Sequence, residues 1–183
     1  MNSKSPQLLV VGSVAIDWII TPRAERKESV GGSATFFAMA ASYLANVRLV
    51  GVVGGDFPPA AVADLRAAGV DTSGLEVVED GKTFRWKGQY HDNMNDRTTL
   101  ETHLNCFEHF APKLPPAYRG SEYLFLANIQ PRLQEQVFLQ MQPPRLVGLD
   151  TMNLWISIAN EDLRSVLRHV DVLTLNDEEA RQL

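Results

Sequence analysis

The sequence predicts an α/β fold in which a mostly parallel sheet is flanked by helices and carries a small β lid. Three observations predict it: short apolar runs that end in Gly or Asp, helical periodicity between those runs, and one stretch of strict alternation. The chain has 183 residues, 45% of them hydrophobic and 21% charged, which is enough to bury a sizeable core as one domain.

The most informative segment lies at the start of the chain. The apolar run 8–11 ends at Gly12, as expected of a buried parallel strand, and we expect Asp17 just past the carboxyl end of that strand. Gly31 and Gly32 then begin a helix of small residues, and glycine lets backbone N–H groups approach a ligand at a helix N-terminus. Asp17 and the two glycines are therefore expected to face the same ligand.

Helices and strands then alternate to the end of the chain. Apolar runs predict further strands over 47–53, 76–78, 123–127, 146–149 and 172–175. Helical spacing predicts helices over 33–44, 60–68, 131–141 and 158–169, and a last one that begins at 177. Small residues mark the first helix, while two prolines and Gly69 mark the start and stop of the second, which Asp56 is placed to cap. Because the sequence stops at the first turn of the last helix, we expect a fragment.

Residues 83–105 follow a different pattern. Aromatic residues and glycine alternate with polar residues over 84–90, and 98–103 is again extended after a polar turn. Such alternation indicates an antiparallel hairpin with one covered face, outside the parallel sheet. The hairpin either closes over a ligand as a flap or only shields the core, and periodicity does not separate these two interpretations.

Composition and charge argue against several classes of protein. A net charge of -5 and a pI near 5.3 disfavour a nucleic-acid-binding surface, and the densest basic segment, 23–27, is expected to be a solvated loop. Cys106 is the single cysteine, which excludes an internal disulfide, and the four histidines show no metal-ligand spacing. No apolar run is long enough to span a membrane, and the first residues are no secretory signal, so we expect a cytoplasmic protein without a membrane partner.

Several motifs stand in the order seen in one known family. They are VVGSVAID, GGSAT, VGGDFPPAAVADLRAAGVDTSGL, the extended segment that ends at Asn105, GLDTMN and LTLNDEEARQL. From about Leu8 to Leu183 the chain resembles the ribokinase-like carbohydrate kinases of the PfkB family. The resemblance implies a Rossmann-like α/β domain with a small β lid, formed here by residues of about 17–30 and 83–105. It also implies transfer of the γ-phosphate of ATP, with Mg2+, to a hydroxymethyl group of a sugar or a nucleoside.

The resemblance assigns one set of residues to the acceptor substrate. They are Asp17, Gly31, Gly32, Phe36, Asn105 and Asn128. An ionised carboxylate at Asp17 accepts two hydroxyl donors, as a polyol requires, although such a residue also caps turns and helices. The family often has Asn where Phe36 stands, and His103 replaces the glycine that usually comes two residues before Asn105. Ribose, fructose, another sugar and a nucleoside therefore all stay open as acceptors.

A second set resembles residues on the phosphate side. Asp150 and Asn153 resemble an aspartate and an asparagine near the phosphate path, with a spacing one residue longer than the common form. Asn176 and Glu179 match the Asn-x-x-Glu motif of the family, in which the carboxylate helps to place magnesium through water. The same pair also fits a plain helix N-cap, and both roles are compatible.

One family motif does not occur in the sequence. The Gly-Ala-Gly-Asp loop that carries the catalytic base of the family is missing, so we expect residues 1–183 to be the N-terminal part of a kinase domain, without its ATP-binding half and inactive alone. Two other functions remain open: a non-catalytic ligand-binding or regulatory module, and a dinucleotide enzyme, for which Gly12 lacks the G-x-G-x-x-G continuation. The lid of the family also allows a homodimer.

Overall fold

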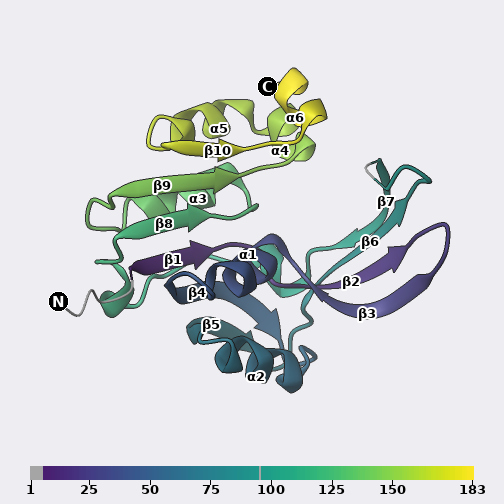
Figure 1. Cartoon of the computed structure of the whole chain (residues 1–183), viewed down its shortest axis with the longest axis horizontal. Coiled ribbons are helices and arrows are strands. Elements are labelled where there is room, and N and C mark those ends of the chain that lie inside the picture. The colour runs from purple at the N-terminus through teal and green to yellow at the C-terminus, as the bar shows by residue number, and fades with distance from the viewer. Residues whose placement is uncertain (1–5, 95) are drawn as a thin grey trace.

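The computed structural model describes residues 6–94 and 96–183 and confirms the predicted α/β class (Figure 1). Its main sheet has six strands in the order β10-β9-β8-β1-β4-β5, and all neighbours are parallel. The strands are β1 (Gln7–Val11), β4 (Asn46–Gly54), β5 (Asp71–Val78), β8 (Tyr123–Leu126), β9 (Leu146–Asp150) and β10 (Val172–Thr174).

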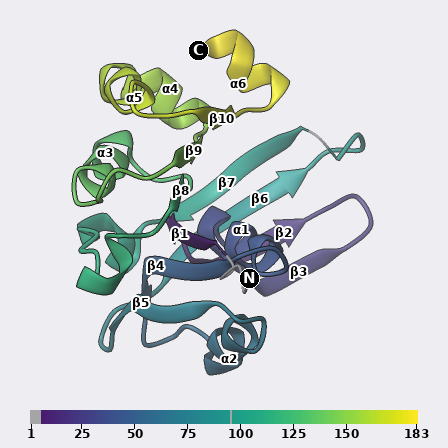
Figure 2. The same ribbon diagram turned by 60° about the vertical axis from the view of Figure 1, so that its left-hand side comes forward.

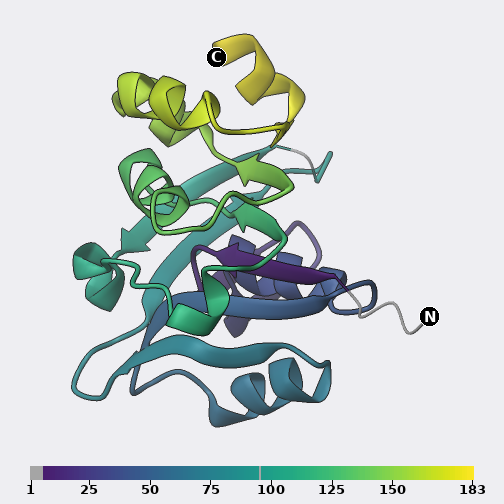
Figure 3. The same cartoon turned by 90° about the vertical axis from the view of Figure 1, so that its left-hand side faces the viewer.

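Helices cover both faces of this sheet (Figure 3). One face carries α1 (Ser33–Ala41) and α2 (Pro59–Ala67), and the other carries η1 (Asn105–His109), η2 (Pro116–Tyr118), α3 (Pro131–Phe138), α4 (Asn153–Ile158) and α5 (Asn160–Leu167). In β1, Val10 packs toward α1 and α2, while Leu9 and Val11 pack toward the opposite face. The period of two along a strand thus divides the core into two apolar clusters. A final helix, α6 (Asp177–Gln182), follows β10.

A second sheet of four strands forms the lid, in the order β3-β2-β6-β7. Its strands are β2 (Ala15–Ile20), β3 (Glu25–Gly31), β6 (Phe84–Tyr90) and β7 (Arg97–His103). The β2–β3 and β6–β7 pairs are antiparallel, and the two hairpins join through parallel pairing of β2 with β6. The lid stands beyond the carboxyl ends of the main strands, and β7 is its strand nearest to α6 (Figures 1 and 2).

Asp56 anchors the root of the lid instead of capping α2 as the sequence suggested. Its Oδ1 accepts hydrogen bonds from the backbone N–H and the hydroxyl of Thr83, and its Oδ2 accepts one from Arg85 at 3.0 Å. Partial burial acts to raise the pKa of Asp56, but these donors outweigh it and lower the pKa. The α2 helix begins after Pro58 without a side-chain cap.

Three other expectations differ from the structure. Residues 25–27 of the expected loop belong to β3, where Lys27 Nζ lies 4.3 Å from the centroid of the Trp18 ring. The β5 strand begins at Asp71, because pairing with β4 overrides turn-like composition. The helix expected over 158–169 begins at Asn160 as α5, and the separate helix α4 over Asn153–Ile158 was not expected. Asn160 Nδ2 donates to Ile156 O between the two helices, where such a bond competes with a continuous helix.

None of the helices in the described part of the chain is long and apolar enough to cross a membrane.

Candidate functional site

Two clusters of polar groups lie where the main strands end and the lid begins. We name them by their central carboxylates. The Asp17 cluster comprises Asp17, Ser29, Gly31, Gly32 and Trp86. The Asp150 cluster comprises Arg97, Asn128, Asp150, Thr151, Asn176 and Glu179.

Asp17 is a buried carboxyl group on the lid. It is 9% exposed and lies opposite Ser29 of β3 and Trp86 of β6 in the sheet register. Burial raises the pKa of Asp17 to about 6, and no hydrogen bond or charge of the described residues offsets this effect. Ser29 Oγ is also buried without a hydrogen-bond partner. Two adjacent polar groups are therefore left to be satisfied by a ligand that donates hydrogen bonds.

Gly31 brings the backbone close to Asp17, whereas Gly32 lies against the backbone of Ser13 and Val14. A methyl group at Gly31 would overlap the Asp17 carboxylate, so only glycine fits there. Gly32 has φ 93°, in the left-handed region that favours glycine. It is the N-cap residue of α1 and has no side chain to accept a hydrogen bond from the first turn. Ser13 takes over part of the cap, because its Oγ accepts from Ser33 N at 3.1 Å and its carbonyl accepts from Ala34 N.

Gly31→Ala is expected to lower the free energy of unfolding by about 1–3 kcal/mol, because the added methyl group must displace the buried Asp17 side chain. Urea unfolding measures this loss. Gly120→Ala is the matched control, since its methyl group would meet only the flexible end of Gln142, at 3.2 Å. Equal stability of the two variants would contradict the close packing of Gly31 on Asp17.

One aromatic residue, Trp86, belongs to the Asp17 cluster, and a second, Phe36, lies next to it in the fold, with its N–H donating to Gly32 O. Trp86 is on the same face of the lid as Asp17, with its ring over Gly88 and its Nε1 donating to Thr99 Oγ1 at 3.2 Å. Phe36, in the first turn of α1, is 58% exposed rather than part of the core. Sequence reasoning did not select Trp86, although alternation over 84–90 already assigned it to one face of a hairpin.

Asn105 lies at the root of the lid, where η1 begins. Its Nδ2 donates to Thr83 O at 2.8 Å, and its own φ is 52°. The side chain therefore ties the end of β7 to the start of β6. Its predicted part in acceptor binding stays a prediction.

The Asp150 cluster lines a cavity of about 330 Å³ at the carboxyl ends of β9 and β10. Burial, and then the charge of Glu179, raise the pKa of Asp150 to about 6, against the opposing effect of backbone N–H groups of Asn128 and Thr151. Thr151 Oγ1 is buried without a hydrogen-bond partner. Arg97 reaches this cavity from the lid strand β7, and its charge favours the ionised form of Asp150.

Asn176 and Glu179 form the helix cap that the sequence suggested. Asn176 Oδ1 accepts from Glu179 N at 2.8 Å, and Glu179 Oε2 accepts from Asn176 N at 3.0 Å. Glu179 is only 5% exposed yet lines the cavity. Asn153 does not line this cavity. It is the first residue of α4, and its backbone carbonyl accepts a hydrogen bond from Gln182 Nε2.

Two residues join the Asp150 cluster in a way that sequence reasoning missed. Asn128 was grouped with the acceptor residues, but the structure places it beside Asp150, with its Oδ1 accepting from Trp155 Nε1 at 2.9 Å. Arg97 was not selected at all, because nothing in the local sequence of a lid strand indicates how far its tip reaches. Only the packing of the lid against the end of the main sheet reveals it.

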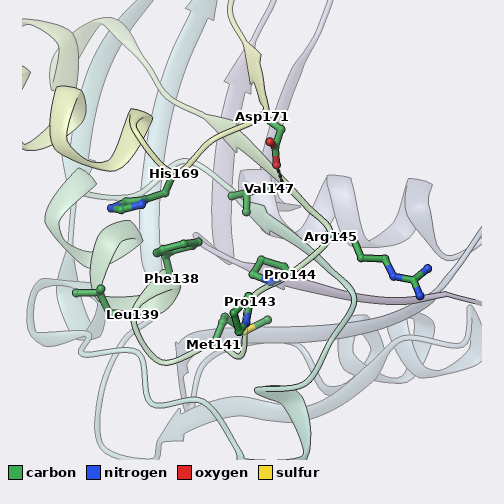
Figure 4. A pocket seen from close by; sticks show the side chains of 9 residues that line it. All are labelled: Phe138, Leu139, Met141, Pro143, Pro144, Arg145, Val147, His169 and Asp171. Atoms are coloured by element: carbon green, nitrogen blue, oxygen red, sulfur yellow. Dashed lines mark hydrogen bonds between the residues drawn. The ribbon is translucent and has the colours of Figure 1, made fainter.

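A second cavity, of about 400 Å³, lies at the amino ends of β9 and β10 (Figure 4). Its wall is largely apolar, with Phe138, Met141 and two prolines. The Asp171 carboxylate there already accepts from Val147 N, and Arg145 is paired with Glu122 at 3.4 Å. We therefore place the candidate site at the carboxyl ends, where polar groups are buried without partners.

Comparisons with known proteins show which proteins the chain is similar to in sequence and in fold. Residues 5–183 match the family model described as pfkB family carbohydrate kinase. A cytidine kinase of Thermococcus kodakarensis is 27% identical over 176 residues, which cover 94% of this chain and 62% of that protein.

Solved structures share the fold. A nucleoside kinase of Methanocaldococcus jannaschii, described as an archaeal member of the ribokinase family, has a TM-score of 0.77 at 21% identity, covering 98% of this chain and 63% of its own. A nucleoside kinase of Burkholderia thailandensis in complex with inosine has a TM-score of 0.75 at 18% identity. The match covers 95% of this chain and 62% of the kinase. The chain thus spans less than two thirds of the length of these relatives.

Proposed function

Because the chain belongs to the pfkB family of carbohydrate kinases, we propose that the protein containing it transfers the γ-phosphate of ATP to a hydroxymethyl group of a nucleoside. One observation carries the proposal: the Asp17 carboxylate is buried against Gly31 without a hydrogen-bond partner. Such a group is costly unless a ligand satisfies it, and sugar hydroxyls are suitable donors. The similarity to a cytidine kinase, at 27% identity, supports a nucleoside over a free sugar.

The Asp17 cluster would hold the acceptor. Asp17 accepts hydrogen bonds from two sugar hydroxyls, and Ser29 Oγ offers a further donor or acceptor beside it. Trp86 is fixed over Gly88 by its bond to Thr99, which leaves an aromatic surface of the lid on the side of Asp17. A nucleobase stacks well on such a surface, whereas a free sugar has no aromatic face to offer.

The Asp150 cluster would lie on the phosphate side. Arg97 supplies a permanent positive charge from the lid, suited to the charge that develops on a transferred phosphoryl group. The arginine comes to the cavity from β7, so closure of the lid over the acceptor would also bring this charge to the reaction. Acceptor binding and charge stabilisation are thereby linked through one sheet.

The residues of this cluster fit a magnesium ion that keeps most of its water. Oxygen atoms of Asp150, Asn176 and Thr151 are of the type that Mg2+ prefers, and Thr151 Oγ1 is buried without a partner. Within 6–94 and 96–183 no group of three or more His, Cys, Asp or Glu could hold a metal, so bound water and ATP phosphates would complete the shell. Glu179 would act through such water, because its Oε2 accepts from Asn176 N. When bound, Mg2+ neutralises phosphate charge.

We further propose that residues 1–183 alone do not turn over, because the sequence holds no Gly-Ala-Gly-Asp loop to supply the base and its anion hole. The test compares ATP consumption by this chain and by the complete reading frame, across a panel of nucleosides and sugars. We expect nucleoside-dependent turnover by the longer protein only. Turnover by residues 1–183 would refute the need for that loop. A longer protein that uses only sugars would refute the nucleoside assignment, and one that binds nucleosides without turnover would favour a binding module.

A further inference from the structure

Gln134 is a fully buried amide beneath the Asp150 cluster. It lies in α3 and is 0% exposed. Its Nε2 lies within hydrogen-bond distance of three carbonyl oxygens, those of Leu126 (3.2 Å), Ala127 (3.1 Å) and Asp150 (3.0 Å). The opposite orientation of the amide would turn Oε1 toward these three acceptors, so the network fixes Nε2 as the inward atom.

These carbonyl groups belong to the carboxyl ends of two neighbouring strands. Pairing of β8 with β9 stops at Leu126 and Leu149, so Ala127 and Asp150 lie just beyond the ladder. The amide of Gln134 fills the place where the two strands separate, and it replaces ladder bonds that the backbone no longer makes there. One side chain thus bridges the two strand ends.

The same two strand ends carry the groups of the Asp150 cluster. Asn128 follows Ala127 directly, and its backbone N–H, like that of Thr151, is close enough to the Asp150 carboxylate to lower the pKa of that group. The Asn128 amide is held in turn by Trp155. A shift of either strand end would therefore move both Asp150 and Asn128.

A glutamine at position 134 is less favourable for core packing than an apolar side chain would be. Its Oε1 is buried without a hydrogen-bond partner, which costs about 1–3 kcal/mol. The two N–H groups of Nε2, shared among the three carbonyl oxygens, offset this cost, and an all-apolar side chain would have left those oxygens without this donor. The residue therefore serves the geometry of the strand ends.

We propose that Gln134 is a positioning residue for phosphoryl transfer, which holds the ends of β8 and β9 so that Asp150 and Asn128 keep their mutual geometry. The proposal rests on the kinase function proposed above. Gln134 itself touches no substrate, and the Asp17 cluster lies on a different sheet. Its loss should therefore lower kcat while leaving the KM for the acceptor almost unchanged.

The test uses the full-length protein with three variants. Gln134→Met removes the amide, Gln136→Met makes the same change at an exposed position of the same helix, and Val137→Ala weakens the core beside it without touching a polar group. For Gln134→Met we expect kcat to fall by roughly 10- to 100-fold, with the KM for the nucleoside within about twofold. Val137→Ala should keep the kcat of the wild-type protein, even if its melting temperature falls as far as that of Gln134→Met. Should Gln134→Met not fold, Gln134→Asn, one methylene shorter, replaces it with the same expectation.

A second readout does not depend on turnover. In amide NMR spectra, the resonances of Asn128 and Thr151 should shift in Gln134→Met and not in Gln136→Met. A kcat equal to that of Val137→Ala at matched stability, or unchanged resonances, overturns the positioning role. An inactive wild-type protein in which these resonances still shift overturns the kinase function while the control of the strand ends stands.

Discussion

Asp17→Asn is expected to stabilise the protein at pH 7 while removing most of its activity. Burial raises the pKa of Asp17 from 3.8 to about 6, so the folded chain binds the proton more tightly than the unfolded chain does. The free energy of unfolding therefore falls as pH rises from about 3.8 to about 6. Above this range the protein bears the whole cost of burying the ionised Asp17 carboxylate. A neutral amide avoids that cost, which is on the order of 3 kcal/mol for a pKa raised from 3.8 to about 6.

The same substitution removes the acceptor of two sugar hydroxyls. We expect kcat/KM for the nucleoside to fall by roughly 100- to 1,000-fold, as for the loss of charge-assisted hydrogen bonds in a buried site. Urea unfolding at pH 7 and near pH 4, together with steady-state kinetics of the full-length protein, measures both effects. The gain in stability should largely vanish at the lower pH, where Asp17 is already protonated in the folded state.

Asp71→Asn is the matched control for stability. Burial acts to raise the pKa of Asp71, but hydrogen bonds from Ser73, whose N–H donates to Asp71 Oδ1 at 2.9 Å, act against it, and the pKa is lowered, so this carboxylate is already satisfied. We expect Asp71→Asn to lower the free energy of unfolding at pH 7 and to leave kinetics unchanged. If Asp17→Asn instead destabilises the protein as Asp71→Asn does, Asp17 is a structural carboxylate and the acceptor site lies elsewhere.

The second large effect is expected from Arg97→Met. Arg97 reaches the cavity of the Asp150 cluster from the lid, so its loss should remove positive charge from the path of the phosphoryl group. We expect kcat to fall by roughly 100- to 1,000-fold while the KM for the nucleoside changes by less than about threefold, since Asp17 is untouched. Arg97→Lys should recover part of the loss, because a point charge remains without the planar donors.

Lys87→Met is its control on the same lid. Lys87 lies on the face of the lid opposite to that of Trp86. Its Nζ pairs there with Glu101 at 2.7 Å and lies 3.9 Å from the centroid of the Trp18 ring. Both variants lose one cation from the lid, but only Arg97 is directed toward the cavity. Steady-state kinetics that give the two variants the same kcat would exclude a role for Arg97 in charge stabilisation.

Much of the fold could be predicted from the sequence because its signals are local. Apolar runs predicted the parallel strands, and the Asn176 and Glu179 pair predicted the cap of α6, which depends on residues three apart. Strand pairing is not local, and this is why β5 extends through residues of turn-like composition. The same limit explains why residues 25–27 form a strand and not the expected loop, since the pairing of β3 with β2 includes them.

The candidate site could be predicted only in part. Asp17 and the glycine pair are close in sequence, so their approach followed from one strand and one helix start. Arg97 and Gln134 act at the Asp150 cluster through a lid strand and a buried helix face, whose positions depend on packing between distant segments. Asn128 shows the same limit, since a polar residue after a strand does not reveal which neighbouring strand end it will join.

The most direct test is a crystal structure of the full-length protein with the nucleoside that gives the highest kcat/KM. We predict that both oxygens of Asp17 accept hydrogen bonds from sugar hydroxyls beside Gly31, with the hydroxymethyl group directed toward the Asp150 cluster. A nucleoside bound away from Asp17, for example in the apolar cavity at the amino ends of β9 and β10, would contradict the account.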